Sequence, residues 1–414
     1  MSQRGILLRL RRAAMTLLLV VNTAAILAAQ EPQTGPPDSE TDVPDLIRAW
    51  RNKAAPPPSP PGERMIVAAP IIGSNPSAGF QLGVAAQVAT FRGDPSTTRI
   101  SSGIASLSFS TKKHVLLNVR FDTYSEGNRW VIKGDNRFQL TSQDIYGFGS
   151  ATPSSAAVNT DYDFVRVHET IYRRVANDVY VGGGFLLDSH SNVEPSEASD
   201  PAWPSSPYLI YSQKHGLPTD AQQSVGFSAN LLVNRRDNDI NARSGWRVDA
   251  RYRGSFGGFL GGDSSWQEFD VDGRTYLPLD TRGRHRLALW SYASIVTSGV
   301  APYFDVPATV MDTYGRSARG YQEGRYRGEH LVYGEAEYRG PLMRNGLLGM
   351  VAFVTMTTVS NHDTDESLFH SVAVSSGGGL RLLLNKRSRT NLCFDFAWGK
   401  DGASGVYLAI QEAF

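Results

Sequence analysis

Polar and apolar residues alternate with a period of two along most of the chain that follows Arg64. The clearest case is residues 245–256, in which alternate positions are apolar or charged: Trp246, Val248, Ala250 and Tyr252 against Arg247, Asp249, Arg251 and Arg253. Successive side chains of a β-strand point to opposite faces. The pattern therefore predicts strands that are apolar on one face and ionic on the other.

Segments of this kind recur to the end of the sequence and predict about sixteen strands. We expect them at residues 66–73, 77–90, 97–110, 113–124, 128–140, 162–174, 178–189, 223–235, 245–255, 265–277, 285–297, 330–341, 347–358, 371–385, 390–399 and 404–413. Most are long enough to cross a bilayer at a tilt of about 45°. A soluble β-sandwich also has strands with one apolar face, so the strand pattern alone leaves that alternative open.

The links between these segments alternate in length, and this decides between the two folds. Links after even-numbered strands include the short ones, at 92–96, 125–127, 175–177 and 386–389. Links after odd-numbered strands include the long ones, at 141–161, 190–222, 298–329 and 359–370. Short turns on one rim and long external loops on the other are typical of outer-membrane barrels. We therefore expect an all-β protein, a single transmembrane antiparallel β-barrel of about 16 strands.

The charged rows of such a barrel are expected to face its lumen. An Arg or Lys on the lipid face near the bilayer midplane would cost about 2–4 kcal/mol. Closure of the sheet would also remove the unpaired strand edges, which lipid cannot solvate.

Composition and scattered polar residues mainly exclude functions. The 41 Lys and Arg balance 40 Asp and Glu, so nothing indicates binding to nucleic acid. Cys393 is the single cysteine, and the eight histidines form no His-Glu-x-x-His pair, so we expect no disulfide framework, metal or cofactor. We also expect no enzyme activity, because nothing in the sequence fixes His114 or His168 beside a nucleophilic serine.

The N-terminal part of the sequence predicts a signal peptide at residues 1–29. Arginines precede an apolar run from Ala13 to Ala25 that is too short to span a bilayer, and small residues follow it. An uncleaved anchor is the alternative, because Leu27 stands where a small residue is preferred. Residues 30–64 are rich in proline and predict an extended periplasmic tether, followed by the barrel at 65–414.

A short amphipathic helix is predicted inside the tether, at residues 43–52. A helix of this length is marginal on its own. It would be mobile, or else docked as a plug or as a motif for a partner.

Four motifs of the predicted barrel occur in an order that resembles a known family. They are Ala318-Arg319-Gly320-Tyr321 between the eleventh and twelfth predicted strands, the turn at 236–246 that ends in Ser-Gly-Trp, the strand at 334–342, and the last hairpin at 394–414. Together they resemble the bacterial surface antigen superfamily, which includes BamA, TamA and the two-partner secretion transporters.

The resemblance implies a bacterial outer-membrane protein that inserts or translocates other proteins through a barrel with a lateral seam. Its sixth extracellular loop would fold inward and meet the barrel wall. Implied partners are outer-membrane lipids, unfolded or secreted client proteins, and a separate periplasmic or lipoprotein partner. A passive pore or a structural barrel without insertase activity is the alternative.

Within this resemblance, Arg319, Gly320 and Tyr321 form a loop brace. The family often has an Asp on the thirteenth strand to hold the motif's arginine, but this sequence has Phe353-Val354-Thr355-Met356 there. The candidate partners of Arg319 are therefore Glu335, Glu337 and Asp395. Family members that assemble or secrete proteins usually carry N-terminal POTRA domains. Residues 30–64 are too few and too rich in proline to form one, so we expect a barrel-only member.

Two further motifs and one strand edge complete the expectations. The turn motif consists of Asp237, Asp239, Asn241 and Gly245, whose acidic residues either bind a cation or accept backbone hydrogen bonds within the turn. The resemblance also implies a terminal strand signal at Leu408, Ile410 and Phe414. The first strand, at 66–73, is short and contains Pro70, which predicts few hydrogen bonds at its seam with the last strand.

Overall fold

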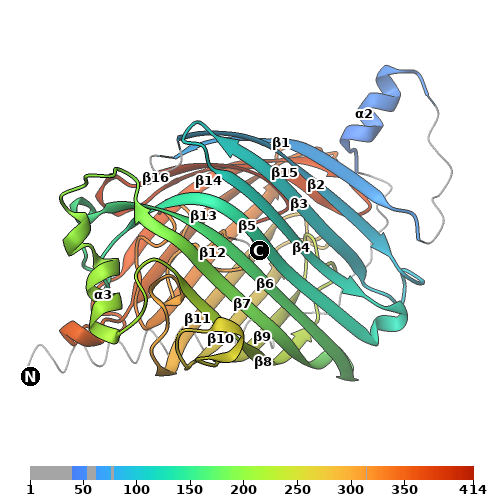
Figure 1. The fold of residues 1–414 in the computed structure, drawn as a ribbon. Helices are drawn as coiled ribbons and strands as arrows, with labels where there is room; N and C mark the ends of the chain where they lie inside the picture. Colours follow the sequence, from blue (N-terminus) through green and yellow to red (C-terminus); the bar gives the residue numbers. More distant parts are fainter. Residues whose placement is uncertain (1–39, 54–61, 76–78, 314) are drawn as a thin grey trace, which may run out of the picture.

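The computed structural model describes residues 40–53, 62–75, 79–313 and 315–414. The predicted signal peptide, residues 1–29, and much of the predicted tether lie outside the described residues. Sixteen strands form one antiparallel sheet in which strands that are consecutive in the chain pair with each other. The sheet curls into a tilted barrel (Figure 1). The predicted fold class and strand number are thus confirmed.

The strands follow the predicted segments closely. They are β1 (Met65–Asn75), β2 (Gly79–Phe91), β3 (Ile100–Ser110), β4 (Val115–Tyr124), β5 (Trp130–Ile145), β6 (Val158–Ala176), β7 (Val179–Pro195), β8 (Gln222–Asn234), β9 (Gly245–Ser255), β10 (Trp266–Pro278), β11 (Arg286–Gly299), β12 (His330–Pro341), β13 (Leu348–Val359), β14 (Ala373–Asn385), β15 (Thr390–Trp398) and β16 (Ser404–Ile410).

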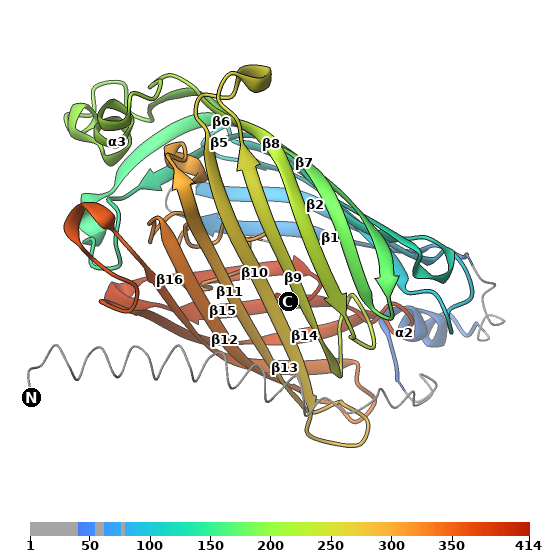
Figure 2. The same cartoon turned by 90° about the horizontal axis from the view of Figure 1, so that it is seen from below.

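In the part of the chain that the structure describes, the α-helices are α2 (Val43–Trp50) and α3 (Pro207–His215), one at each rim of the barrel (Figure 2). Short 3-10 helices cover Glu126–Asn128, Ser154–Ala156, Trp203–Ser205, Phe259–Gly261, Tyr303–Asp305, His362–Thr364 and Lys400–Gly402. We call the end with α3 the long-loop rim and the opposite end, with α2, the short-turn rim (Figure 2). Among the described residues, no helix has the length and apolar character needed to span a bilayer.

The alternating pattern determines which face of the sheet is polar. On β2, Leu82 and Val84 are exposed on the outer face, whereas Gln87 is buried on the inner face. Lys133 of β5 lies 2.7 Å from Asp249 of β9. Because β5 and β9 are not neighbours in the sheet, this ion pair reaches across the inside of the barrel. The inner face therefore carries the charges and the outer face the apolar side chains.

Several strand bounds differ from the prediction: β5 ends at Ile145 and not at 140, β6 begins at Val158 and not at 162, and β7 ends at Pro195 and not at 189. Two further differences concern the first and last strands. β1 is not short, since it pairs with β2 along its whole length, from Met65 with Ala89 to Asn75 with Gly79. β16 ends at Ile410 and not at residue 413, because Gln411 adopts a positive φ of 76° that turns the chain out of the sheet. The residues after Ile410 enter the lumen, as described below.

β1 and β16 meet at a seam that has no β-ladder. The sheet order runs from β1 to β16, and the described residues form no pairing between these two strands. β1 contacts β14 as well as β16, so it lies partly over the sheet and not simply beside its edge. Ile410 and Leu392, of β16 and β15, share an apolar cluster with residues on the inner face of β1: Val67, Ala69 and Ile71. The barrel thus closes by an apolar overlap.

The turn between β8 and β9 covers the lumen at the short-turn rim. Its Ile240 packs with Met65 of β1 and Ile100 of β3. Its backbone accepts a hydrogen bond from Arg99, from the link before β3, at 2.8 Å. On the opposite side, Asp237 forms an ion pair with Arg389 of the β14–β15 turn. One turn therefore connects separated parts of the barrel wall.

Candidate functional site in the barrel lumen

The loop at residues 300–329, between β11 and β12, folds into the lumen and contacts opposite walls. Gln143 of β5 donates a hydrogen bond to the carbonyl oxygen of Glu323 at 2.9 Å. Arg137, also on β5, donates to the carbonyl oxygen of Thr313 at 2.9 Å. On the other side, the loop contacts β12 and β15 through Arg319. The loop is therefore held at several points along its path.

Arg319 lies among three carboxylates of the barrel wall. Its Nη2 donates to Glu335 and to Glu337, both on β12, and its Nη1 donates to Asp395 Oδ2 on β15 at 2.7 Å. Only 2% of the Arg319 side chain is exposed, and those of both glutamates are fully buried. The three residues that the sequence indicated as alternative partners thus all contact the same guanidinium group.

Other arginines extend this ion network toward the short-turn rim. Arg339 Nε lies 2.6 Å from Glu337 Oε1. Arg381 contacts Asp395 and also Glu412, where its Nε lies 2.7 Å from Oε2. Buried carboxylates need charged or hydrogen-bonding partners, since burial of an uncompensated charge is very costly. The inward position of Glu412 also explains why an acidic residue is tolerated beside the apolar residues at the end of the chain.

Phe353 supplies a contact that sequence reasoning missed. Its ring centroid lies 3.5 Å from the Arg319 guanidinium carbon. A guanidinium plane stacks favourably on an aromatic face. In the stretch of β13 where the related family often has an aspartate, Phe353 therefore supplies an aromatic support. The missing aspartate on β13 indicated that Arg319 needs a different partner there, but it did not indicate that an aromatic ring stacks on the guanidinium group.

Gly320 and Tyr321 fix the backbone directly after Arg319. The Gly320 N–H donates to the Tyr407 hydroxyl of β16 at 2.8 Å. The Tyr321 hydroxyl donates to the Val374 carbonyl oxygen at 2.6 Å and accepts from the Lys400 N–H at 2.8 Å. The motif therefore joins β14, β16 and the link after β15.

Replacement of Gly320 by alanine is expected to loosen the loop. Gly320 has a φ of +102°, and an added Cβ would lie 3.2 Å from the Gly399 nitrogen, a backbone atom that cannot rotate away. Backbone strain of this kind costs about 1–3 kcal/mol. We expect faster protease cleavage within residues 300–329 in Gly320→Ala. Gly315→Ala is the matched control, because its φ of +62° lies in the left-handed region that alanine adopts at lower cost than a φ of +102°, and the nearest atom is 3.6 Å away. Equal cleavage of the two variants would contradict the argument.

The turn motif accepts hydrogen bonds from its own backbone and contacts neighbouring arginines. Asp237 accepts backbone hydrogen bonds from Arg243 and Ser244, at 2.8 and 3.2 Å. The Asp239 carboxylate lies 2.7 Å from Arg236 Nη2, and Asn241 accepts from Arg286. Gly245 has a φ of +93°. No group of three or more potential metal ligands occurs in the part of the chain that the structure describes.

The residues of the terminal strand signal do not share one environment. Leu408 and Ile410 belong to β16, whereas Phe414 is buried in the lumen against Trp290, with ring centroids 5.3 Å apart. Arg316 of the inward-folded loop holds the intervening segment. It donates to the carbonyl oxygens of Gln411 and Glu412 at 2.6 Å and to that of Ile410 at 2.9 Å. This contact was not indicated by any motif.

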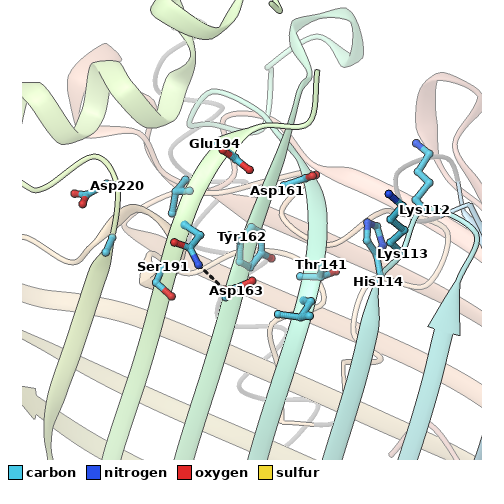
Figure 3. A pocket seen from close by; sticks show the side chains of 14 residues that line it. Lys112, Lys113, His114, Thr141, Asp161, Tyr162, Asp163, Ser191, Glu194 and Asp220 are labelled. Atoms are coloured by element: carbon cyan, nitrogen blue, oxygen red, sulfur yellow. Dashed lines mark hydrogen bonds between the residues drawn. The ribbon is translucent and has the colours of Figure 1, made fainter. Parts of the chain in front are cut away.

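A separate cavity of about 620 Å³ lies near the long-loop rim (Figure 3). Polar side chains from several strands line it, and Asn192 donates a hydrogen bond to Asp163 there at 2.6 Å. None of the motif residues discussed above lines this cavity. The Arg319 site is therefore distinct from it.

Comparisons with known proteins agree with the barrel fold. The Omp85 superfamily domain matches residues 191–414. Among solved structures, BamA from Haemophilus ducreyi lacking POTRA domains 1–3 is similar with a TM-score of 0.51 and 16% identity, over 84% of this chain and 69% of that chain. CdiB from Escherichia coli has a TM-score of 0.54 and 11% identity, over 87% and 63%.

CdiB from Acinetobacter baumannii has a TM-score of 0.51 and 12% identity, over 84% of this chain and 59% of that chain. Matches to this chain thus span less than two thirds of either CdiB chain. No curated protein sequence matches this chain. At these identities the structural likeness concerns the fold.

Proposed function

The chain belongs to the Omp85 superfamily of outer-membrane barrels, and on that premise we propose that it inserts or translocates client proteins by opening the seam between β1 and β16. The clients would be unfolded outer-membrane proteins or secreted proteins, with outer-membrane lipids around the barrel and a separate periplasmic or lipoprotein partner delivering the client. No covalent step is required, because the work consists of exposing and closing a strand edge.

The lack of a ladder at the seam is the observation that carries this proposal. Neighbouring strands elsewhere are joined by continuous backbone pairing, whereas β1 and β16 contact each other through apolar side chains. An unpaired edge presents backbone N–H and C=O groups that can pair with an added strand. A cavity of about 250 Å³ reaches this seam and is lined by β1, β16 and Arg319. A client strand would thus find both an edge and adjacent space.

The Arg319 site is proposed to act as the brace of the inward-folded loop. Its guanidinium connects β12, which is far from the seam, with β15 at the seam. Charge-assisted hydrogen bonds are among the stronger polar contacts in proteins. The brace would hold the loop and the β15–β16 hairpin in one arrangement while β1 moves.

A reversible cross-link across the seam tests this function. Ile72→Cys and Leu408→Cys place thiols on β1 and β16, beside the same cavity, in a Cys393→Ser background. We expect a cleavable bifunctional maleimide to reduce insertion of an unfolded barrel protein to the rate of protein-free vesicles. Cleavage of the linker should restore insertion.

The matched control joins β2 and β3, which already form a ladder. Leu82→Cys and Phe109→Cys are directly paired and exposed on the outer face. Their cross-link should leave insertion unchanged. Undiminished insertion with the seam bridged would refute the proposed route. Steady current through planar bilayers without any client insertion would favour a passive pore.

A further inference from the structure

Helix α2 presents its apolar face away from the barrel. Leu46 and Ile47 are each 45% exposed and Trp50 is 82% exposed, whereas Asp42 is buried and Asp45 is half-buried. An amphipathic helix of a soluble domain normally packs its apolar stripe on the core. In α2 the polar side faces the protein and the apolar side faces outward, which is the reverse of that orientation.

Polar contacts hold α2 in this reversed orientation. Lys386 Nζ, from the β14–β15 turn, lies 2.8 Å from Asp45 Oδ2, and the Lys386 N–H donates to Asp42 at 3.0 Å. Burial raises the pKa of Asp45, but the hydrogen bond from Lys386 helps to lower it to about 2. Asp45 is therefore charged at neutral pH. Just before the helix, Glu40 accepts hydrogen bonds of 2.6 and 2.8 Å from Arg243.

A turn hydrogen-bonded to the segment before α2 exposes further apolar side chains. The Thr41 N–H donates to the carbonyl oxygen of Asn345, in the β12–β13 turn, at 2.9 Å. The same turn exposes Leu342 and Met343, by 53% and 44%. In Figure 1, α2 projects beyond the outline of the barrel wall at the short-turn rim. The exposed apolar side chains of α2 and of this turn therefore lie at the same rim.

Exposed basic residues follow the apolar face along the chain. Arg51 and Lys53 are both exposed, directly after Trp50. Apolar side chains combined with Lys and Arg are typical of helices that lie in the headgroup region of a membrane. Anionic headgroups would be attracted to this end of α2. A tryptophan also favours the membrane–water interface, where one side of its ring is apolar and the other is wet.

We propose that α2 binds anionic phospholipid and lies in the interface of the leaflet next to the short-turn rim. Leu46, Ile47 and Trp50 would enter the acyl boundary, while Arg51 and Lys53 contact phosphate groups. The polar contacts to Lys386 and Arg243 would set the height of the helix at the rim. This inference does not depend on client insertion.

Spin labelling of the full chain in vesicles tests the location of α2. Cys393→Ser removes the native thiol, and a nitroxide is attached to Ile47→Cys or, as a control, to Glu126→Cys, which is exposed at the same rim. The accessibility of the nitroxide to oxygen and to a water-soluble nickel complex is measured in vesicles of phosphatidylcholine with phosphatidylglycerol. We expect label 47 at a depth of about 5–10 Å, reached by oxygen and shielded from nickel. Label 126 should be reached by nickel.

The other outcomes overturn the proposal. If nickel reaches label 47 as readily as label 126, the face is in water. If both reagents are excluded from label 47, protein covers it, from another part of this chain or a second copy. Label 47 should lie deeper in vesicles with phosphatidylglycerol than in vesicles without it. As a second variant, Arg51→Gln with Lys53→Gln should abolish this difference in depth. An undiminished difference would contradict the predicted headgroup contacts.

Discussion

Arg319→Ala is expected to lower the free energy of unfolding by about 3–5 kcal/mol, which is the cost of removing one partner from a buried ion pair. The variant leaves Glu335, Glu337 and Asp395 without their shared cation. Arg339 and Arg381 still contact two of them, so the remaining imbalance falls mainly on Glu335. Guanidinium unfolding in lipid vesicles measures the loss, and proteolysis of residues 300–329 shows whether the loop is released.

Two companion variants separate the proposed brace from a general effect of lost charge. Arg387→Ala removes an exposed arginine that pairs with Glu63, and exposed pairs contribute about 0–1 kcal/mol. Glu335→Gln added to Arg319→Ala should recover part of the loss, because it removes the stranded charge. A loss of less than about 1 kcal/mol in Arg319→Ala would contradict a buried brace.

Lysine at position 319 should restore stability only in part. Arg319 uses different nitrogens for Asp395 on one side and for the two glutamates on the other. A single ammonium group lacks that spread and the flat face that stacks on Phe353. Loop cleavage in Arg319→Lys should fall between those of the wild type and Arg319→Ala.

Arg316→Ala is expected to release the segment after β16, with the second largest effect. Each hydrogen bond from a charged donor is worth about 1.5–3 kcal/mol, and Arg316 donates to three carbonyl oxygens. The Cys393 thiol donates to the Gln411 carbonyl oxygen at 3.1 Å and is buried beneath this segment. We therefore expect maleimide labelling of Cys393 to accelerate. If the segment is held by about 2 kcal/mol less free energy, the labelling rate should rise roughly 30-fold.

The specificity of this readout can be checked within the same chain. Arg316→Lys keeps the charge but cannot reach three oxygens at once, so its labelling rate should be intermediate. Arg387→Ala, at an exposed turn, should label at the wild-type rate. An unchanged rate in Arg316→Ala would mean that the segment is held by Glu412 and Phe414 alone.

Local sequence pattern was sufficient for the strands, since the two faces of each strand must meet different surroundings. Residues 245–255 were predicted with the bounds that β9 has in the structure. Contacts between strands that are far apart in the chain are harder to predict from sequence. Glu335, Glu337 and Asp395 were separate alternatives because their joint position depends on how β12, β15 and the inward loop meet in space. No local pattern specifies that geometry.

The end of the chain shows a second limit of sequence reasoning. Apolar residues in phase extended the predicted strand to 413, but Gln411 turns the backbone with a positive φ. Glutamine is not a residue that signals such a turn. The predicted short helix is present at Val43–Trp50, within the predicted range 43–52. Its polar contacts with Lys386, and the preceding Glu40–Arg243 contact, involve turns far away in the chain.

The apolar overlap at the seam has a consequence for its strength in a bilayer. Acyl chains surround Leu392 and Ile410 about as favourably as protein side chains do, because lipid tails are equally apolar. Separation of β1 from β15 and β16 would therefore expose little to water. The resistance to separation would come from the packing of these side chains against β1. Lipid could replace protein along this line one side chain at a time.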